Sequence, residues 1–424
     1  MGLLLLITER APGSLAIPLR YAQASATLAR TSGQPRHRKC TTGKLSILLC
    51  LAGTVPLVFA AKPVTVAKLE QELAYAHGQP DTKVAEQLFD LALTERVSAA
   101  RLARWEGELP GPKSRQALVE LADASAFVSL PSEEIPATPA PDRAAQDSLL
   151  ALTKNYAVDT IPKLPNFFAT RDTTFFSDEP EKINTLTLVD AQYRKLHLVG
   201  VSSVKVYFRA GKEVVVTNTN KQVSFSGKAL TTQGVFGEAM ELVLSDILRN
   251  SLVWSHWEGG ADALLAVFRY AVPLERSHYA VAIPDAPGRS QPSVAYHGEI
   301  AIDPANGTIL RLTAVAELSG TSSIANGDVM VEYGPVEIAG ASYICPVKSV
   351  SFTVARTVNT KANYQNKFGP ASTKAGPLLT KVNDVQFKQY HRFRAETRIL
   401  TGDDAEPVST PPASGSVPNS TPKP

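Results

Sequence analysis

Two pairs of side chains have types and a spacing that suit a divalent metal ion. One pair is His256 with Glu258 and the other is His297 with Glu299, and one residue separates the members of each pair. Residues i and i+2 of a β-strand project from the same face, so each pair would present an imidazole beside a carboxylate. If the two strands were neighbours, the four groups would close a site for a metal-assisted hydrolase. The alternative is that all four are polar positions on a solvent-facing sheet surface.

Other catalytic signatures are missing from the sequence. It contains no Gly-rich phosphate loop followed by Lys-Ser or Lys-Thr, no dinucleotide fingerprint and no His-Glu-x-x-His helix. A Gly-x-Ser-x-Gly elbow is approached only at 200–204, where Val204 replaces the last glycine. We interpret His278 as a sheet residue rather than a general base, and Trp254 and Trp257 as core rather than as a carbohydrate-stacking surface. We therefore expect a protein without catalytic residues or cofactors.

The charge of the chain is distributed unevenly. There are 43 Lys and Arg residues against 40 Asp and Glu residues, but residues 1–60 hold seven of the basic ones and only Glu9 of the acidic ones. From residue 61 onward the chain is slightly acidic, whereas a nucleic-acid-binding protein would carry a positive field on its body. The composition, 44% hydrophobic and 20% charged, also excludes a wholly disordered chain and a polytopic membrane protein.

A segment with the parts of a secretory signal ends at Ala60. The basic stretch 36–44 precedes an apolar run, 45–60, which Pro56 interrupts, and a small residue stands at the exit. These features are typical of an exported protein, so we expect cleavage between Ala60 and Ala61. The run is shorter than the roughly 20 apolar residues that a membrane-spanning helix needs. We therefore expect a periplasmic or extracellular protein whose mature chain has no transmembrane span.

Only Cys345 of the three cysteines lies beyond this cleavage site. A mature chain with one cysteine has no intrachain disulfide and no cysteine-ligated metal cluster. Cys345 lies in an apolar string, 343–347, and the neighbouring sequence offers no activating base. We therefore interpret it as a small buried hydrophobe rather than a nucleophile.

The hydrophobic period first indicates a helical part. In residues 61–130 apolar side chains recur every three or four positions, and Gly and Pro separate short segments, which predicts a small helix bundle. Asp81 is the expected N-cap of the second helix, which would run through Leu91. Residues 131–165 are expected to form a Pro-rich linker followed by a helix at about 143–159.

The pattern then changes to a period of two, which predicts an antiparallel β domain over residues 166–402. A clear hairpin turns at 303–307, and a long half-buried strand is expected over 385–395 with its odd-numbered side chains in the core. Two segments rich in Gly, Pro, Ser and Thr are expected to be a long loop, 359–380, and a disordered tail, 403–424.

One amphipathic helix interrupts the β part. Its apolar stripe, the candidate ligand-binding surface, consists of Phe236, Met240, Val243, Leu244 and Ile247. A closed sheet would cover this stripe, whereas a half-open barrel would leave part of it to line a cavity for an apolar ligand. We expect an α+β fold, with an N-terminal short-helix bundle followed by a curved antiparallel sheet, or half-barrel, wrapped around this helix.

Three stretches of the sequence, 254–281, 296–312 (YHGEIAIDPANGTILRL) and 333–350, resemble a group of exported acidobacterial proteins of unknown function. More distantly, the β part is similar in layout to the outer-membrane lipoprotein-sorting proteins and their periplasmic relatives. That second resemblance implies a curved antiparallel sheet that holds a hydrophobic cavity covered by helices. Neither resemblance supplies a catalytic residue.

Three functions are compatible with the sequence. The first is a non-enzymatic exported envelope protein whose β domain binds an apolar ligand or a lipidated or protein partner. The second is a structural or interaction module without a ligand. The third is the metal-assisted hydrolase that the two His-x-Glu pairs would support.

We expect the native protein to begin at Ala61 and to fractionate outside the cytoplasm. The basic segment and the small residue at the exit of the apolar run are the reasons for this expectation. N-terminal sequencing of the protein purified from its own cells checks it. A soluble cytoplasmic form that starts before Leu45 would contradict it.

Overall fold

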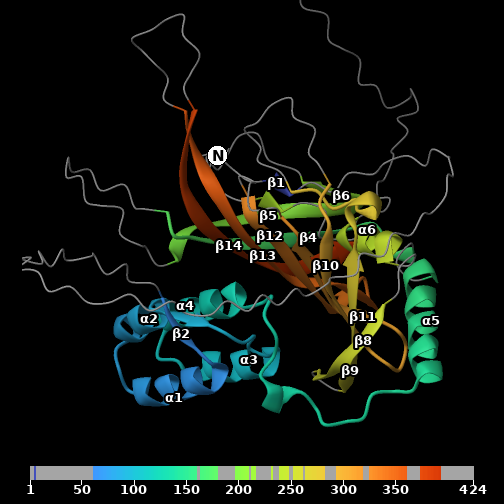
Figure 1. Cartoon of the computed structure of the whole chain (residues 1–424), viewed down its shortest axis with the longest axis horizontal. Coiled ribbons are helices and arrows are strands. Elements are labelled where there is room, and N and C mark those ends of the chain that lie inside the picture. Colours follow the sequence, from blue (N-terminus) through green and yellow to red (C-terminus); the bar gives the residue numbers. More distant parts are fainter. Residues whose placement is uncertain are drawn as a thin grey trace, which may run out of the picture.

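The computed structural model describes residues 4–5, 61–159, 163–179, 196–209, 212–215, 231–232, 238–247, 252–260, 263–281, 293–318, 324–360 and 373–392. Within these residues the protein has a mixed α+β fold with one large antiparallel sheet and few helices (Figure 1). None of the described helices is both long and apolar enough to cross a membrane. The apolar run up to Ala60, Phe236 and residues 393–395 and 403–424 lie outside the described residues.

Short helices and one small parallel ladder make up the chain from residue 61 to residue 159. They are α1 (Val66–Ala76), α2 (Asp81–Phe89), α3 (Ala99–Glu108), α4 (Pro112–Ala124), the 3-10 turn η1 (Ser132–Glu134) and α5 (Arg143–Asp159), with β2 (Lys62–Val64) beside β3 (Leu91–Leu93). Leu69, Leu88, Trp105 and Leu118 belong to a separate hydrophobic cluster within α1 to α4. These four helices therefore share a core of their own, and α5 has the bounds that the sequence predicts.

Asp81 has a different role from the predicted one. It is the first residue of α2, whose N-cap is Pro80, and Leu91 belongs to β3 rather than to α2. The carboxylate of Asp81 instead accepts the backbone N–H groups of Ser114 (2.8 Å) and Lys113 (3.1 Å) at the start of α4. It thereby satisfies two donors that a helix N-terminus leaves unpaired. Hydrogen bonding with the side chain of Ser114, and then with the backbone of Ser114 and Lys113, lowers the pKa of Asp81.

Ten strands form one antiparallel sheet in the order β6, β5, β4, β14, β13, β12, β11, β10, β9, β8. Their bounds are β4 (Phe167–Ser177), β5 (His197–Arg209), β6 (Lys212–Val215), β8 (Val253–Gly259), β9 (Leu264–Val272), β10 (Tyr296–Ile302), β11 (Ile309–Ala316), β12 (Ile324–Ile338), β13 (Ala341–Thr360) and β14 (Thr373–Arg392). The other elements are α6 (Glu238–Ile247), the 3-10 turn η3 (Leu274–Arg276) and the short pair β1 (Leu4–Leu5) and β7 (Thr231–Thr232). The sheet is open, because β6 and β8 stand at opposite ends of the strand order.

One face of the sheet carries the main hydrophobic core. Phe268, Ile300 and Val331 belong to this core, and so do Leu244 of α6 and Leu149 of α5. We call this side of the sheet the α6 face. Apolar side chains therefore hold both helices on the same side of the sheet.

The opposite face packs against the end of α4. Met330, Val350 and Val382 form a smaller cluster there with Ala126, which follows α4 directly. We call this side the α4 face. Figure 1 shows α1 to α4 gathered together, away from α5 and α6. The two sides of the sheet thus have different helical partners.

Strands β13 and β14 extend further than the sequence predicts. Their pairing continues to Thr360 and Thr373, so both strands enter the segment 359–380, which was expected to be a loop. The physical reason is that backbone ladder bonds do not require apolar side chains, and strand preference depends on context. The prediction of a loop is therefore wrong for residues 359–360 and 373–380, which belong to strands.

A bulge changes which side chains of β14 face the core. Val385 and Phe387 are buried as predicted, but the register then shifts and Gln389 adopts a φ of 55°. Beyond this bulge Tyr390 is buried and His391 is exposed. The predicted alternation is wrong after Phe387, because an extra residue in one strand reverses the side-chain positions that follow it.

The single cysteine of the described residues behaves as the sequence predicts. Cys345 is a free thiol with 0% of its surface exposed. Burial raises the pKa of this thiol to about 12, so it stays protonated at neutral pH. The interpretation as a small buried hydrophobe is confirmed.

The hairpin turn between β10 and β11 docks on α5. The side chain of Asp303 accepts bonds from Ala305 and Asn306, both at 2.9 Å, and Gly307 closes the turn with a φ of 78°. A Cβ atom at Gly307 would lie 2.4 Å from the carbonyl carbon of Leu152 in α5. The turn therefore needs glycine here both for its conformation and for its approach to the helix.

We expect Gly307→Ala to lower the free energy of unfolding by more than Gly340→Ala does. The two glycines have φ angles of 78° and 81°, a conformation that costs an alanine about 1–2 kcal/mol. Only at Gly307 would the new Cβ also collide with the backbone of α5, since nothing lies within 4 Å of the Cβ position at Gly340. Urea denaturation of the two variants measures the difference, and equal losses would contradict the close contact.

Candidate functional site

The two His-x-Glu pairs lie on strands that are not neighbours. His256 and Glu258 are on β8, His297 and Glu299 are on β10, and β9 lies between the two strands. All four residues occupy positions on the α4 face. Within the described ranges, no group of three or more His, Cys, Asp or Glu side chains is placed to hold a metal ion.

Glu258 is the centre of a buried ion cluster. Its Oε2 accepts hydrogen bonds from Nη2 of Arg96 at 2.9 Å and from Nη2 of Arg311 at 2.7 Å. Its Oε1 accepts a hydrogen bond from Nη1 of Arg311. Burial alone would raise the pKa of Glu258, but His256 and the two guanidinium groups outweigh it and hold the pKa far below its usual value. Both carboxylate oxygens are therefore committed to arginine rather than free for a metal ion.

The remaining members of the two pairs have other neighbours. Nε2 of His256 lies 3.7 Å from Glu258, beyond a direct hydrogen bond, and Nδ1 of His297 lies 3.2 Å from Glu317. The carboxylate of Glu299 lies 3.8 Å from the guanidinium of Arg311. The structure therefore gives each of the four residues a polar neighbour of its own within 4 Å and does not bring the two histidines together.

A row of alternating charges continues across the α4 face. Arg311 on β11, Glu332 on β12 and Lys348 on β13 oppose one another in register. Nζ of Lys348 lies 2.7 Å from Asp123 of α4 and 3.8 Å from Asp384 of β14. The ion pair of Lys348 with Asp123 is therefore a second point, besides the buried ion cluster, at which the α1–α4 region is attached to the sheet.

Two acidic side chains of α4 are buried at this contact. Glu120 is 4% exposed and Asp123 is 2% exposed. Burial raises the pKa of Glu120 to about 8 and that of Asp123 to about 7, although Lys348 pulls the pKa of Asp123 the other way. Burial alone would lower the pKa of Lys348, but the negative charges of Asp123 and Asp384 outweigh the effect of burial and raise this pKa. The lysine stays charged while the carboxyl groups of α4 titrate near neutral pH.

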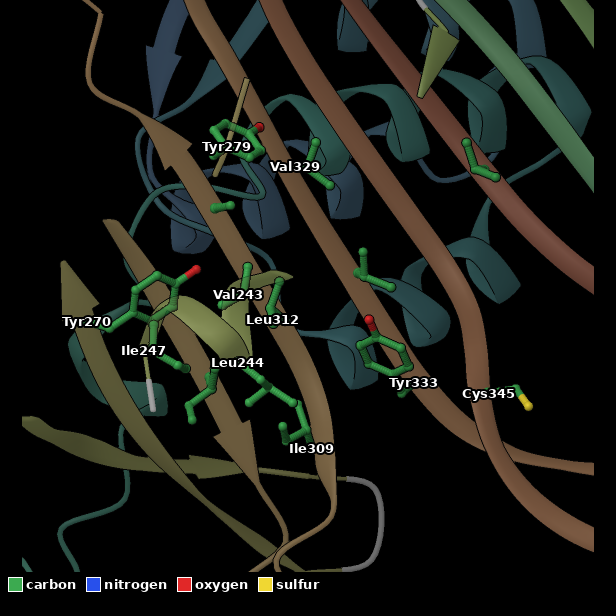
Figure 2. Packing of buried hydrophobic residues seen from close by; sticks show 14 of the residues in the cluster. Val243, Leu244, Ile247, Tyr270, Tyr279, Ile309, Leu312, Val329, Tyr333 and Cys345 are labelled. Carbon is green, nitrogen blue, oxygen red and sulfur yellow. The ribbon is translucent and has the colours of Figure 1, made fainter. Parts of the chain in front are cut away.

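The described part of the candidate ligand-binding stripe is packed in the main core. Val243, Leu244 and Ile247 are 2%, 4% and 0% exposed. Figure 2 shows these three side chains beside those of the α6 face. The side chain of Met240 and all of Phe236 lie outside the described residues. The structure thus brings three of the five predicted residues together on the sheet.

Asp246 anchors α6 to the sheet. Its buried carboxylate accepts the hydroxyl of Tyr296 at 2.8 Å and the backbone N–H of His278 at 3.1 Å, and it lies 2.5 Å from Nδ1 of the same histidine. The side chain of His278 is 43% exposed. An aspartate also orients the histidine of a catalytic triad. In the part of the chain that the structure describes, however, no nucleophile hydrogen-bonds to His278.

The two tryptophans of β8 lie against the main core. The rings of Trp254 and Trp257 are 4.9 Å apart, and Trp254 lies 5.4 Å from Phe268. Nε1 of Trp257 donates to the backbone oxygen of Pro139, in the Pro-rich linker 131–142, at 2.9 Å. Both rings are therefore partly buried at the margin of the main core, which bears out the interpretation as core only in part.

A row of hydroxyl groups on the α6 face was missed by the sequence analysis. Ser349, Ser351 and Thr353 alternate along β13, and Ser349 opposes Val331 of the main core. We call these three residues the polar stripe. They are 0%, 1% and 1% exposed, and their hydroxyl groups have no hydrogen-bond partner among the described residues. The hydroxyl of Tyr333 on β12 is also buried without a hydrogen-bond partner among the described residues.

We expect the free energy of unfolding to fall as the pH rises from about 5 to about 8. Burial raises the pKa of Glu120 from 4.5 to about 8. The folded protein therefore holds this proton more tightly, so the stability is greatest below the unfolded pKa and is lost as the pH rises through the folded one. One such group gives a slope of at most about 1.4 kcal/mol per pH unit.

Urea denaturation at a series of pH values measures this slope. Glu120→Gln should reduce this slope, and the raised pKa of Asp123 should supply the part that remains. Glu86→Gln, at an exposed position of α2, should leave the slope unchanged. An equal slope in wild type and Glu120→Gln would show that Glu120 is not the group that titrates.

Comparisons of the chain with protein-family models, with curated proteins and with solved structures found no match. The resemblances to exported acidobacterial proteins and to lipoprotein-sorting proteins therefore stay predictions.

Proposed function

We propose that the protein is an exported, non-enzymatic protein of the cell envelope that binds an apolar ligand, or the lipidated segment of a partner, on the α6 face of its sheet. In this proposal the open sheet curls as a half-barrel around α6. The ligand lies on the α6 face, across the polar stripe and beside the helix.

The polar stripe is the observation that carries this proposal. Ser349, Ser351 and Thr353 bury hydroxyl groups that find no partner among the described residues. Protein interiors satisfy nearly all of their buried polar groups, so three unsatisfied groups on one strand indicate a place for a further partner. Each unsatisfied group costs the fold about 1–3 kcal/mol. A ligand with a hydrogen-bonding group would recover part of this free energy.

The surroundings of the polar stripe suit the apolar body of such a ligand. Val331 opposes Ser349 and Val329 opposes Ser351 in the neighbouring strand β12. Both valines belong to the main core, which also contains Val243, Leu244 and Ile247 of α6. Many apolar side chains with a few hydrogen-bonding groups are the usual composition of a small-molecule site.

A scaffold without a ligand is the second candidate function. The observation that favours it is the burial of Val243, Leu244 and Ile247, which leaves the described part of α6 closely packed on the sheet. In that case the protein would act through surfaces such as those of the α1–α4 region. The two candidates differ in what the hydroxyl groups of the polar stripe do.

We expect Thr353→Val to leave the melting temperature unchanged or higher and to weaken ligand binding. Valine has nearly the shape of threonine, so the change removes a buried hydroxyl that lacks a partner among the described residues. The probe is an uncharged pyrene-labelled long-chain alcohol, titrated by fluorescence. Loss of one hydrogen bond to the probe should weaken binding by about fivefold to tenfold.

Thr313→Val is the matched control. Thr313 is also buried, at 8% exposed, but its hydroxyl accepts the backbone N–H of Glu299 at 2.9 Å. Its replacement should lower the melting temperature and leave probe binding unchanged. A wild-type protein that does not bind the probe would favour the scaffold instead.

A further inference from the structure

The α1–α4 region is built as a separate unit. It has a hydrophobic core of its own, and the Pro-rich linker 131–142 connects it to α5. Among the described residues, its apolar contact with the sheet is small, since it contributes Ala124, Ala126 and Phe127 to the cluster on the α4 face. Charged groups make the other contacts. A unit of this kind can leave the sheet without losing its own core.

The buried ion cluster attaches this region to the sheet close to the linker. Arg96 bonds to Glu258, and its backbone N–H donates to the carbonyl oxygen of Ser129 at 2.9 Å, two residues before the linker begins. Although burial opposes them, His256 and the two arginines of the cluster hold the pKa of Glu258 far below its usual value. This attachment therefore persists as the pH changes, and it is the point about which the region can turn.

The contact around Lys348 is the attachment that the pH can change. The ammonium group of Lys348 lies 2.7 Å from Asp123 and 3.8 Å from Asp384. One lysine and five acidic side chains from four elements act on one another here, and we call them the acidic latch. Its members are Lys348 of β13, Glu106 of α3, Glu120 and Asp123 of α4, Glu332 of β12 and Asp384 of β14.

The other elements that pack against α4 do not neutralise the acidic latch. Arg311 of β11 opposes Glu332 in register, but it forms two hydrogen bonds with Glu258. Arg115 of α4 is exposed to solvent. Asp81 of α2 contacts α4 at its other end, and β3 contributes no charged residue. The latch therefore has an excess of acidic groups that a single lysine cannot balance.

The two carboxyl groups that α4 contributes are buried. Glu120 and Asp123 are 4% and 2% exposed, and Oδ2 of Asp123 has no hydrogen-bond partner among the described residues. Burial raises the pKa of Glu120 to about 8 and that of Asp123 to about 7, and Lys348 offsets only part of the effect on Asp123. Because water would restore the usual pKa of both groups, α4 binds the sheet most tightly when they are protonated. Its attachment weakens as the pH rises through these two values.

We propose that the α1–α4 region is a pH-controlled lid on the α4 face of the sheet. At acidic pH the lid is closed on the acidic latch. At alkaline pH the buried carboxyl groups of α4 lose their protons, and α4 moves away from the sheet while Arg96 stays bound to Glu258. Opening exposes the apolar cluster around Met330 to solvent. This inference concerns the α4 face and does not depend on a ligand at the α6 face.

Thiol reactivity of the full chain at about pH 6 and about pH 9 tests the lid. Met330→Cys places a thiol on the sheet side of the contact, and Ala126→Cys places one on the lid side. Each rate is divided by that of an unstructured cysteine peptide at the same pH, and mass spectrometry identifies the modified cysteine. Both thiols should react at least about tenfold faster at the higher pH. The reason is that each proton released raises the opening equilibrium by up to about tenfold per pH unit.

Cys345 is the internal control for global unfolding, because it is buried in the main core. It should stay unreactive at both pH values, and the helical circular dichroism signal should not change. In the Ala126→Cys background, Glu120→Gln should reduce the increase in rate, since it removes one of the two protons. Glu86→Gln, at an exposed position of α2, should leave the increase as it is.

Three results would overturn the lid. The first is an equal normalised rate at the two pH values in both cysteine variants. The second is reaction of Cys345 together with the introduced thiol, or loss of the helical signal, because the protein or the α1–α4 region would then be unfolding. The third is an increase in Glu120→Gln as large as that in Glu86→Gln, which would remove the latch as its cause.

Discussion

The bonds of Glu258 to two arginines hold the α1–α4 region against the sheet. Arg311 comes from the sheet, whereas Arg96 comes from the chain before α3, so one carboxylate joins both parts of the protein. The α1–α4 core and the main core are separate hydrophobic clusters, and among the described residues the small cluster around Ala126 is the apolar contact that joins the two parts. Removing one partner of a buried ion pair typically costs about 3–5 kcal/mol, because the other charge stays buried. The position of this region therefore depends on charge.

Local patterns in the sequence predicted the elements whose signals are local. The helical period placed α5, the change to a period of two predicted an antiparallel β part, and the Asp303 to Gly307 turn placed a hairpin. The failures involve contacts between segments far apart in the sequence. Asp81 looks like an N-cap of its own helix, but its carboxylate binds the start of α4, 32 residues later. The bulge at Gln389 has no sequence signal of its own, so the strand alternation was extended too far.

The candidate site was only partly predictable for the same reason. The rule for residues i and i+2 correctly placed His256 and Glu258 on one face of the sheet. Their partners, however, depend on which segments meet in the fold. Arg96, a partner of Glu258, lies 162 positions away in the sequence and could not be found by a local rule. The alternation of the polar stripe is visible in the sequence of β13. Ser351 and Thr353 alternate with Phe352, and such a pattern by itself favours the face of the apolar residue as the core face. Both faces of this central strand are buried, and the main core lies on the side of the hydroxyl groups.

The contact of the Pro-rich linker 131–142 with β8 bears on self-association of the protein. The end strand of an open sheet has unpaired backbone groups and tends to recruit a strand from another chain. Pro139 and the other prolines of the linker lack the N–H that a further strand would need, yet the linker reaches Trp257 of β8 through its carbonyl oxygen. The linker can therefore cover this edge without extending the sheet. Self-association by strand addition is consequently disfavoured where the linker meets β8.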